Sequence, residues 1–499
     1  MGYKYCIWKG GESMKQFDAR NLSMMFDLYE MTMANGYFED KERDRDDYVS
    51  FDVFYRNNPD AGGFAIFAGL EQVLDYLENL HFSTEDIAYL RSLHVFSEPF
   101  LQWLETYQFR GSVYAMPEGS IIYPDEPLLT VYAPLIDAQL VETAILCEIN
   151  HQSLIATKAQ RIVKAAQGRG VSDFGARRAH NMDAAVYGAR AAYIGGANST
   201  ATVLAGQMFN IPVSGTMAHS WVMYYDDEYT AFKRFAEIYP DNAILLVDTY
   251  DVLDSGVPNA IRVAKEVLEP MGKRLKGIRI DSGDLAYLSK KARKMLDAAG
   301  LTDAIIVMSN SLDEYTISSI LEQGGCVDSF GVGERLITAK SDPVFGAVYK
   351  LVAVHKDKAI IPKIKISETF EKITNPGRKR AWRVYDKTGH AIADLLTLLD
   401  EDPREVKEFP FVDTQRPWKK MTFRDCTFRE LQELVLEKGK RTHPSPSLEE
   451  IRHYVRQQLD HEIWPEEQRF SNPHTHFLDM SPKYYAMKMR LLEDAKKEK

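Results

Sequence analysis

The sequence predicts an α/β protein built as an incomplete (β/α) barrel, with a mixed α+β sandwich domain and a C-terminal, mostly helical extension. Three observations carry this prediction. From about residue 240, short apolar runs alternate with amphipathic helical patterns. Their spacing of about 30 residues is typical of βαβ units. Polar residues follow each apolar run. A doubly wound sheet would show the same alternation, and we favour the barrel.

The central region supplies the predicted parallel strands, because its apolar runs are short and helical patterns separate them. Four regular strands are expected at Ala243–Asp248, Gly277–Asp281, Ala304–Ser309 and Ser329–Val332. The helices between them are expected at Asn259–Leu268, Leu285–Ala299 and Asp313–Gln323. Two less regular strands are expected upstream, at Gly170–Phe174 and Ile211–Ser214.

The flanking regions have a different texture. The N-terminal part mixes β-like pieces with helical patterns, at Tyr48–Tyr55, Leu128–Tyr132, Gly69–Leu80 and Ala138–Ile149. Basic β hairpins are expected at Lys363–Ser367 and Arg383–Tyr385, and polar helices beyond about residue 420, one of them starting with a Ser447–Glu450 capping box. We expect an N-terminal α+β domain (1–150), a barrel-like catalytic domain (151–345) and a C-terminal region (346–499) that partly completes the N-terminal domain. Residues 1–13 have the character of an extension or leader.

Charge and cysteine usage exclude several classes of protein. The chain has 61 Lys+Arg and 72 Asp+Glu, a net charge of −11, and no basic block, which argues against nucleic-acid binding. No apolar run reaches the roughly 18–20 residues of a membrane helix, and the N-terminus lacks the apolar stretch of a secretory signal. The four cysteines lie far apart. We therefore expect reduced thiols and a cytoplasmic location.

The carboxyl ends of the predicted strands carry the residues that could do chemistry. Parallel strands place these ends on one face of a sheet, which is where such folds bind ligands. Glycines at Gly331 and Gly333 would expose backbone N–H groups to a phosphate. Asp248 and Asp281 offer the hard oxygen ligands that Mg²⁺ prefers. Asp251 and Asp284 are instead expected to cap helices.

Three arginines and one histidine also follow these strands. Arg177, Arg178 and Arg279 need anionic partners, which could be nearby aspartates or the carboxylate or phosphate of a ligand. His219 directly follows a strand end among hydroxyl side chains, where acid–base or nucleophilic chemistry is open. Structural roles are expected for the remaining candidate histidines, His180, His474 and His476.

Together these motifs resemble the nicotinate phosphoribosyltransferase family, within the type II phosphoribosyltransferase group. The resemblance covers about residues 14–400, and its motifs follow one another in the same order. They include NLSMMFDLYEMTMA (Asn21–Ala34), VSDFGARRA (Val171–Ala179), SGTMAHS (Ser214–Ser220), LVDTYDVLDS (Leu246–Ser255), GIRIDSGDL (Gly277–Leu285) and GVGERLIT (Gly331–Thr338).

This resemblance implies a reaction and a set of roles. The ring nitrogen of nicotinate would displace diphosphate from phosphoribosyl diphosphate, with Mg²⁺, and ATP hydrolysis would be coupled through a phosphorylated histidine, His219. The pyridine ring would lie between Phe174 and a Tyr29 from a neighbouring subunit, which implies a homodimer. Arg279 and Thr216 would hold the nicotinate carboxylate. The resemblance places the remaining residues around phosphoribosyl diphosphate: Arg177 facing it, Asp248 and Asp281 near its ribose or diphosphate with the metal, and Ser309, Asn310, Gly331 and Gly333 at its 5′-phosphate.

Two positions bear on this assignment. Glu334 stands where some relatives have Thr, so its role is open. The segment Gly195–Thr200 has no carboxylate, whereas nicotinamide-using relatives carry one in this turn, so an anionic ring substituent is favoured. The alternatives are a nicotinamide- or quinolinate-using phosphoribosyltransferase, or a catalytically silent ligand-binding barrel.

Overall fold

The computed structural model describes residues 20–42, 44–357, 359–366, 373–414, 416, 418 and 420–497. The chain forms two compact units. The first contains Ile155–Pro343, and the second contains the described parts of Glu12–Leu154 and Val344–Lys499. Helix α6 (Glu142–Ala165) runs across the sequence boundary between them. The leader expected at residues 1–13 lies outside the described residues.

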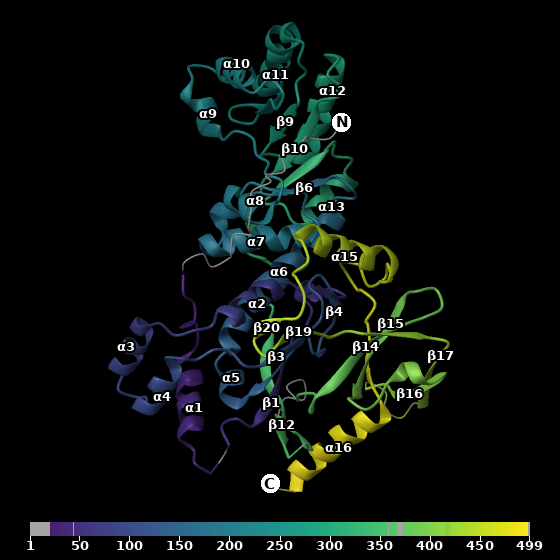
Figure 1. Ribbon diagram of the computed structural model, residues 1–499. Coiled ribbons are helices and arrows are strands. Elements are labelled where there is room, and N and C mark those ends of the chain that lie inside the picture. Colours follow the sequence, from purple (N-terminus) through teal and green to yellow (C-terminus); the bar gives the residue numbers. More distant parts are fainter. Residues whose placement is uncertain are drawn as a thin grey trace. The chain divides into compact units, whose positions relative to one another are not determined.

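The first unit is built on a six-stranded parallel sheet (Figure 1), in the spatial order β7-β6-β11-β10-β9-β8. The four regular strands predicted from the sequence are confirmed, with small changes of boundary. The strands are β6 (Gly170–Asp173), β7 (Ser199–Thr200), β8 (Ile244–Leu246), β9 (Gly277–Ile280), β10 (Ile305–Ser309) and β11 (Ser329–Val332).

The strand order explains why this sheet is half of a barrel. Strands β8 to β11 are neighbours in sequence order, and β11 then pairs with β6, which pairs with β7. A closed barrel would also pair β7 with β8. In the described part of the chain these two strands are instead the edges of the sheet.

One predicted strand is wrong. The segment Ile211–Ser214 contributes a single bridge, between Val213 and Thr200. The edge strand of the sheet is instead β7, which ends the segment Gly195–Thr200. Pro212 has no N–H to donate, so the ladder cannot extend along this segment.

The two faces of the sheet differ in chemistry because side chains alternate along each strand. Ile278, Ile306 and Phe330 are fully buried on one face. The other face carries Arg279 and, in one register row across four strands, Ser309, Gly331, Ser172 and Ser199. Closed barrels fill this face with large aliphatic side chains. In this row the side chains are small or polar, which leaves room in front of the ends of these strands.

Helices connect the strands of this unit, and α10, α11 and α12 gather beside β9 and β10 (Figure 1). The predicted helices α12 and α13 are confirmed, whereas the first predicted helix is α11 continued by a π-helical turn at Ala264–Leu268. The helices are α7 (Met182–Ile194), α8 (Val203–Phe209), α9 (His219–Tyr224), α10 (Glu228–Ile238), α11 (Val257–Val263), α12 (Leu285–Ala298), α13 (Glu314–Glu322) and α14 (Glu334–Ile337).

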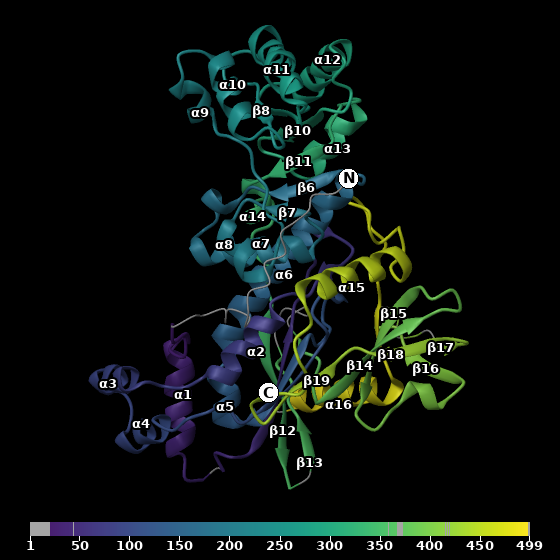
Figure 2. The ribbon, with the colours of Figure 1, turned by 45° about the horizontal axis from the view of Figure 1, so that its top comes forward.

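The second unit combines N-terminal and C-terminal segments in two larger sheets and one two-stranded sheet, β2-β4 (Figure 2). The seven-stranded sheet has the order β13-β12-β1-β5-β3-β19-β20, and the six-stranded sheet β17-β16-β21-β15-β14-β18. The first sheet and the small pair contain β1 (Tyr48–Phe54), β2 (Ala65–Ile66), β3 (Ser112–Ala115), β4 (Ile121–Ile122), β5 (Leu129–Pro134), β12 (Val348–Lys356), β13 (Ala359–Pro362), β19 (Glu433–Glu437) and β20 (Lys440–Arg441). The other sheet contains β14 (Lys379–Tyr385), β15 (Ala391–Leu398), β16 (Glu408–Val412), β17 (Lys420–Arg424), β18 (Thr427–Glu430) and β21 (Leu478–Met480).

The helices of this unit flank the sheets, and α16 packs on β15 and β16. The capping box of Ser447 and Glu450 at the start of α15 is confirmed. The helices are α1 (Leu28–Glu39), α2 (Leu70–Asn79), α3 (Thr84–Ser92), α4 (Glu98–Leu104), α5 (Leu135–Gln139), α15 (Leu448–His461) and α16 (Pro482–Lys497).

The prediction of a mostly helical C-terminal extension is wrong in part. Residues 420–441 form four short strands, and helices follow only from Leu448. Alternating residues such as Leu434 and Leu436 in β19 pair with β3, so contacts distant in sequence determine this structure. The predicted hairpin at Lys363–Ser367 is displaced, since the strand is Ala359–Pro362; Ser367 lies outside the described residues.

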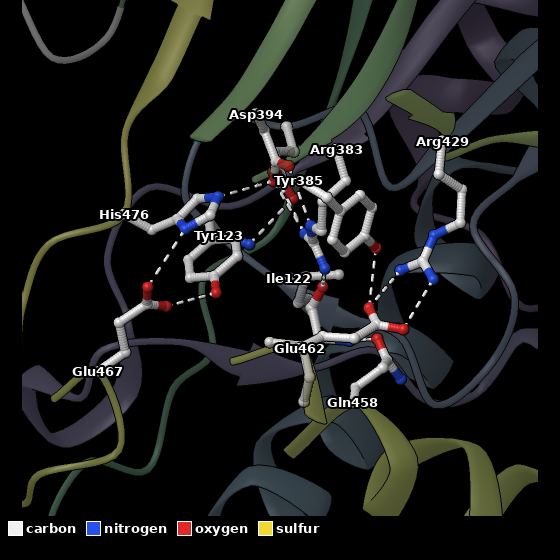
Figure 3. Close-up of polar contacts among 12 residues, drawn as sticks. Ile122, Tyr123, Arg383, Tyr385, Asp394, Arg429, Gln458, Glu462, Glu467 and His476 are labelled. Carbon is white, nitrogen blue, oxygen red and sulfur yellow. Dashed lines mark hydrogen bonds and ion pairs between the residues drawn. The ribbon is translucent and has the colours of Figure 1, made fainter. Parts of the chain in front are cut away.

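A buried network of charged residues lies inside the second unit (Figure 3). The guanidinium of Arg383 donates to both oxygens of Asp394, at 2.9 and 2.8 Å. The His476 ring lies 3.4 Å from Asp394 and 3.5 Å from Glu467, and it stacks on Tyr123. Arg383, Asp394 and His476 are all buried. The structural role expected for His476 is confirmed.

No helix in the described ranges is long and apolar enough to cross a membrane.

Candidate active site

A cavity of about 330 Å³ opens at the carboxyl ends of the strands of the first unit. It brings together six of the residues singled out from the sequence, with small side chains between them. Its lining consists of Phe174, Ala176, Arg177, Ala201, Gly215, Thr216, Met217, Ala218, His219, Leu246, Arg279 and Asp281.

Arg279 is the central cation of this cavity. Its side chain is 11% exposed and forms an ion pair of 3.1 Å with Asp281. Its Nη1 donates to the Thr216 hydroxyl at 3.0 Å, and its Nε donates to the Ser309 hydroxyl at 2.8 Å. The guanidinium lies 5.6 Å from the centre of the Phe174 ring. Arg279 therefore has an internal partner, Asp281, and it also lines the cavity, where it can bind the carboxylate or phosphate of a ligand.

Phe174 is held in place by the backbone around it. A Cβ on Gly331 would lie 2.4 Å from the Phe174 ring, so only glycine lets the ring rest on β11. The N–H of Phe174 donates to Val332 O at 2.8 Å. Asp173, at the end of β6, accepts from the Gly175 N–H and the Thr200 hydroxyl, and burial raises the pKa of this carboxyl. The result is a rigid aromatic wall opposite the arginine.

His219 begins helix α9 and contacts two groups in the site. Its Nδ1 lies 3.2 Å from the hydroxyl of Thr249, and its Nε2 lies 3.6 Å from Asp281 Oδ2. The ring is 40% exposed, so it is open to a ligand. Thr249 was not among the residues singled out from the sequence. Its place directly after Asp248, beyond the end of β8, is the signal that could have identified it.

The two predicted metal-binding carboxylates are neighbours. Asp248 Oδ2 accepts from the Asp281 N–H at 3.1 Å and from the Ser282 hydroxyl at 2.6 Å. Its Oδ1 is buried and has no hydrogen-bond partner among the residues that the structure describes. The capping roles expected for the other two aspartates are confirmed: Asp251 accepts from the backbone of the following turn, and Asp284 from Tyr287 N–H.

The residues expected at the 5′-phosphate separate into two groups. Ser309 is buried, and its hydroxyl also donates to Asp281, so it is already engaged inside the site. Asn310 is exposed in a left-handed conformation with φ 97°, directly after β10. Gly333 follows β11 and precedes α14, and a Cβ there would meet the Phe174 carbonyl oxygen at 3.2 Å.

Three other charged residues surround this region. Glu334, whose role the sequence left open, pairs with Lys340 at 2.6 Å, and this hydrogen bond lowers the pKa of Glu334. Arg177 lines the cavity, and the neighbouring Arg178 is exposed. Tyr29 belongs to the second unit, where it is 45% exposed on α1.

A larger cavity, of about 600 Å³, lies in the second unit between α2, β19 and α15. Its cations are already neutralised within the fold. Arg441 pairs with three carboxylates of α2, and Arg429 pairs with Glu462 at 2.8 Å. The smaller cavity of the first unit is therefore the better candidate for the active site, because its anion-binding groups are accessible.

The geometry defines a class: a (β/α) half-barrel whose ligand site combines an aromatic wall, a guanidinium and paired carboxylates. Comparison with known proteins narrows this class. Family models for nicotinate phosphoribosyltransferase match residues 24–150 (N-terminal domain), 170–387 (family) and 378–488 (C-terminal domain). The chain belongs to the nicotinate phosphoribosyltransferase family.

Individual relatives match between 72% and 96% of this chain. A nicotinate phosphoribosyltransferase of Bacillus subtilis is 45% identical over 483 residues, which cover 96% of this chain and 97% of that protein. One from Mycobacterium tuberculosis is 44% identical over 363 residues, with 72% and 75% covered. The crystal structure of human nicotinic acid phosphoribosyltransferase matches with a TM-score of 0.83 at 30% identity, covering 94% of this chain and 100% of that one.

Proposed function

We propose that this protein is a nicotinate phosphoribosyltransferase that converts nicotinate and phosphoribosyl diphosphate to nicotinate mononucleotide and diphosphate, as a step of NAD biosynthesis from nicotinate. Membership of the family supports this proposal. The single observation in the site that carries it is the Arg279 guanidinium, held 5.6 Å from the Phe174 ring inside the cavity. A flat ring that stacks on Phe174 can direct a carboxylate toward this guanidinium.

Each side chain has a defined task in this proposal. Phe174 stacks on the pyridine ring. Arg279 and the Thr216 hydroxyl bind the carboxylate, for which the planar guanidinium is suited. Arg177, Asn310, Gly331 and Gly333 face the phosphate groups of phosphoribosyl diphosphate. The ring nitrogen is thereby held at the anomeric carbon, so positioning and neutralisation of the departing diphosphate lower the barrier.

Asp248 and Asp281 fit a Mg²⁺ ion. The buried Oδ1 of Asp248 has no hydrogen-bond partner within the described residues, and an adjacent carboxylate, Asp281, is 24% exposed. Mg²⁺ commonly uses one or two carboxylates and completes its shell with water and substrate phosphates. When bound there, the ion would neutralise charge on the leaving diphosphate.

ATP is proposed as a co-substrate that phosphorylates His219. The accessible ring, with Asp281 beside Nε2 and Thr249 beside Nδ1, supports this role. No Walker A motif is present in the sequence, so ATP would use the same anion-binding site.

A homodimer completes the site in this proposal. Tyr29 of the partner subunit would cover the second face of the pyridine ring. The exposure of Tyr29 and of its neighbours Met25, Leu28 and Met33 supports an apolar contact around α1.

The cytoplasmic location remains a prediction, supported by the free thiols of Cys147, Cys326 and Cys426.

The test of the substrate is a comparison of nicotinate, nicotinamide and quinolinate in a diphosphate-release assay with phosphoribosyl diphosphate and Mg²⁺. Nicotinate should have the highest kcat/KM, because only it presents a single carboxylate to Arg279. Faster turnover of nicotinamide or of quinolinate would overturn the assignment.

The test of ATP coupling is His219→Ala. ATP should stimulate the wild type and label it with the γ-phosphate, and neither effect should occur in the variant. His453→Ala, on the exposed face of α15, is the matched control and should behave as the wild type. Equal stimulation of H219A by ATP would exclude the phosphohistidine.

A further inference from the structure

Ser309 occupies a position that the family resemblance does not explain. The resemblance places it at the 5′-phosphate, beside Asn310. Its side chain is instead 3% exposed, at the last position of β10. A hydroxyl that is buried and already paired on both sides is a poor ligand for a mobile phosphate.

The Ser309 hydroxyl uses both of its hydrogen-bonding functions inside the site. It accepts from Nε of Arg279 at 2.8 Å and donates to Oδ1 of Asp281. It therefore bridges the guanidinium and the carboxylate, which also pair directly at 3.1 Å. One hydroxyl thus connects the cation proposed for nicotinate with a carboxylate proposed for the metal.

The five N–H groups of Arg279 show what this bridge accomplishes. Ser309 holds the Nε–H, and Thr216 and the Met217 carbonyl face Nη1 at 3.0 and 3.5 Å. Asp281 takes one N–H of Nη2. A guanidinium held at Nε, Nη1 and Nη2 keeps a fixed plane beside the Phe174 ring.

We propose that Ser309 is a positioning residue for the nicotinate carboxylate, because its hydroxyl fixes the plane of the Arg279 guanidinium. This inference rests on the proposed function and goes beyond it by assigning Ser309 to the ring-binding half of the site. A pre-oriented guanidinium loses less conformational entropy when it binds a carboxylate. An uncharged ring amide draws little benefit from this orientation, so Ser309 also contributes to the choice of substrate.

The test is Ser309→Ala, with nicotinate and phosphoribosyl diphosphate varied separately. We expect the KM for nicotinate to rise about ten-fold, the effect of one lost hydrogen bond to a charged group. The KM for phosphoribosyl diphosphate should stay within about two-fold of the wild type. The ratio of kcat/KM for nicotinate over nicotinamide should fall about ten-fold, an effect that general loosening of the fold would not produce.

A matched pair separates the hydroxyl from the volume of the side chain. Ser309→Thr keeps the hydroxyl and Ser309→Val replaces it by a methyl group of the same shape, so only the valine variant should bind nicotinate weakly. Ser319→Ala is the control, because the Ser319 hydroxyl lies on the exposed side of α13 and accepts from Gln323, away from the cavity. Its kinetics should match the wild type.

The outcomes distinguish this inference from the proposed function. If the wild type turns over nicotinate while S309A raises the KM for phosphoribosyl diphosphate instead, Ser309 is a phosphate ligand and the inference is wrong. Equal nicotinate KM values for S309T and S309V would also overturn it. A wild type that does not use nicotinate would overturn the proposed function, and this inference with it.

Discussion

Two regions of this molecule use the same residue types for opposite purposes. In the cavity of the first unit, Arg279, Asp281 and His219 are 11%, 24% and 40% exposed. In the network of the second unit, Arg383 and Asp394 are 0% exposed and His476 is 1% exposed (Figure 3). Arginine, aspartate and histidine thus form an open site in one place and a closed one in the other.

The difference lies in how accessible each group is to a ligand. The buried network is closed by its own members: Arg383 is bidentate on Asp394 and also donates to Ile121 O, and Glu467 accepts from Tyr123. In the cavity, the exposed fractions of Asp281 and His219 leave both side chains within reach of a ligand. The buried network also holds atoms without a hydrogen bond within the described residues, namely Glu126 Oε1 and both ring nitrogens of His476. Accessibility therefore distinguishes the binding site from the structural core.

The largest expected effect is on stability, from Arg383→Met. The substitution leaves Asp394 and Glu126 buried without the Arg383 guanidinium. The pKa of Glu126 is raised by its burial and by the neighbouring Asp394. We expect the free energy of unfolding to fall by about 3–5 kcal/mol, measured by urea denaturation. Arg404→Met is the control: Arg404 is 53% exposed in its pair with Asp402, and its loss should cost about 1 kcal/mol or less. Similar values for R383M and R404M would contradict the structural role of the network.

The matching change in the cavity is Arg279→Lys, which should alter binding and leave stability nearly unchanged. Lysine keeps a positive charge beside Asp281 but cannot present a planar edge to a carboxylate. We expect kcat/KM for nicotinate to fall about 100-fold, with the free energy of unfolding within about 1 kcal/mol of the wild type. A large loss of stability with intact kinetics would show that Arg279 belongs to the core.

The sequence could predict the parallel strands and their polar ends because both depend on local patterns. Apolar runs such as Ala304–Ser309 stand out by length and composition, and parallel pairing brings their ends together whatever the exact register. Arg177, Arg279 and Asp281 were expected together on these grounds, and they line one cavity. His219 and Thr216 line it too, although the strand predicted before them is wrong. Phe174 and Thr216 were singled out through the family resemblance.

Other features depend on contacts that no local pattern records. The short strand β7 exists because it pairs with β6, and β19 because it pairs with β3. The bridging role of Ser309 requires the direction of its side chain, which the sequence does not give. The buried charges of the second unit were missed for the same reason. Arg383 and Asp394 lie on neighbouring strands, and in the sequence they have the pattern of ordinary β-hairpin residues.

The smallest expected effect is a pH dependence that belongs to the buried region alone. Burial, and Asp413 beside it, raise the pKa of Asp479 from 3.8 to about 7. The folded state therefore binds more protons than the unfolded state between these values, so stability falls as pH rises from about 4 through about 7. We expect the wild type to lose about 2–3 kcal/mol of unfolding free energy between pH 5 and pH 8, and Asp479→Asn to lose less. Burial lowers the pKa of His476, but Asp394 and Glu467 raise it more, so the pKa lies above its usual value. His476 therefore acts in the same direction and accounts for the pH dependence that remains in the Asp479→Asn variant. Asp425→Asn, 70% exposed beside Lys387, should keep the wild-type slope, and a slope unchanged in D479N would show that this carboxyl stays ionised in the core.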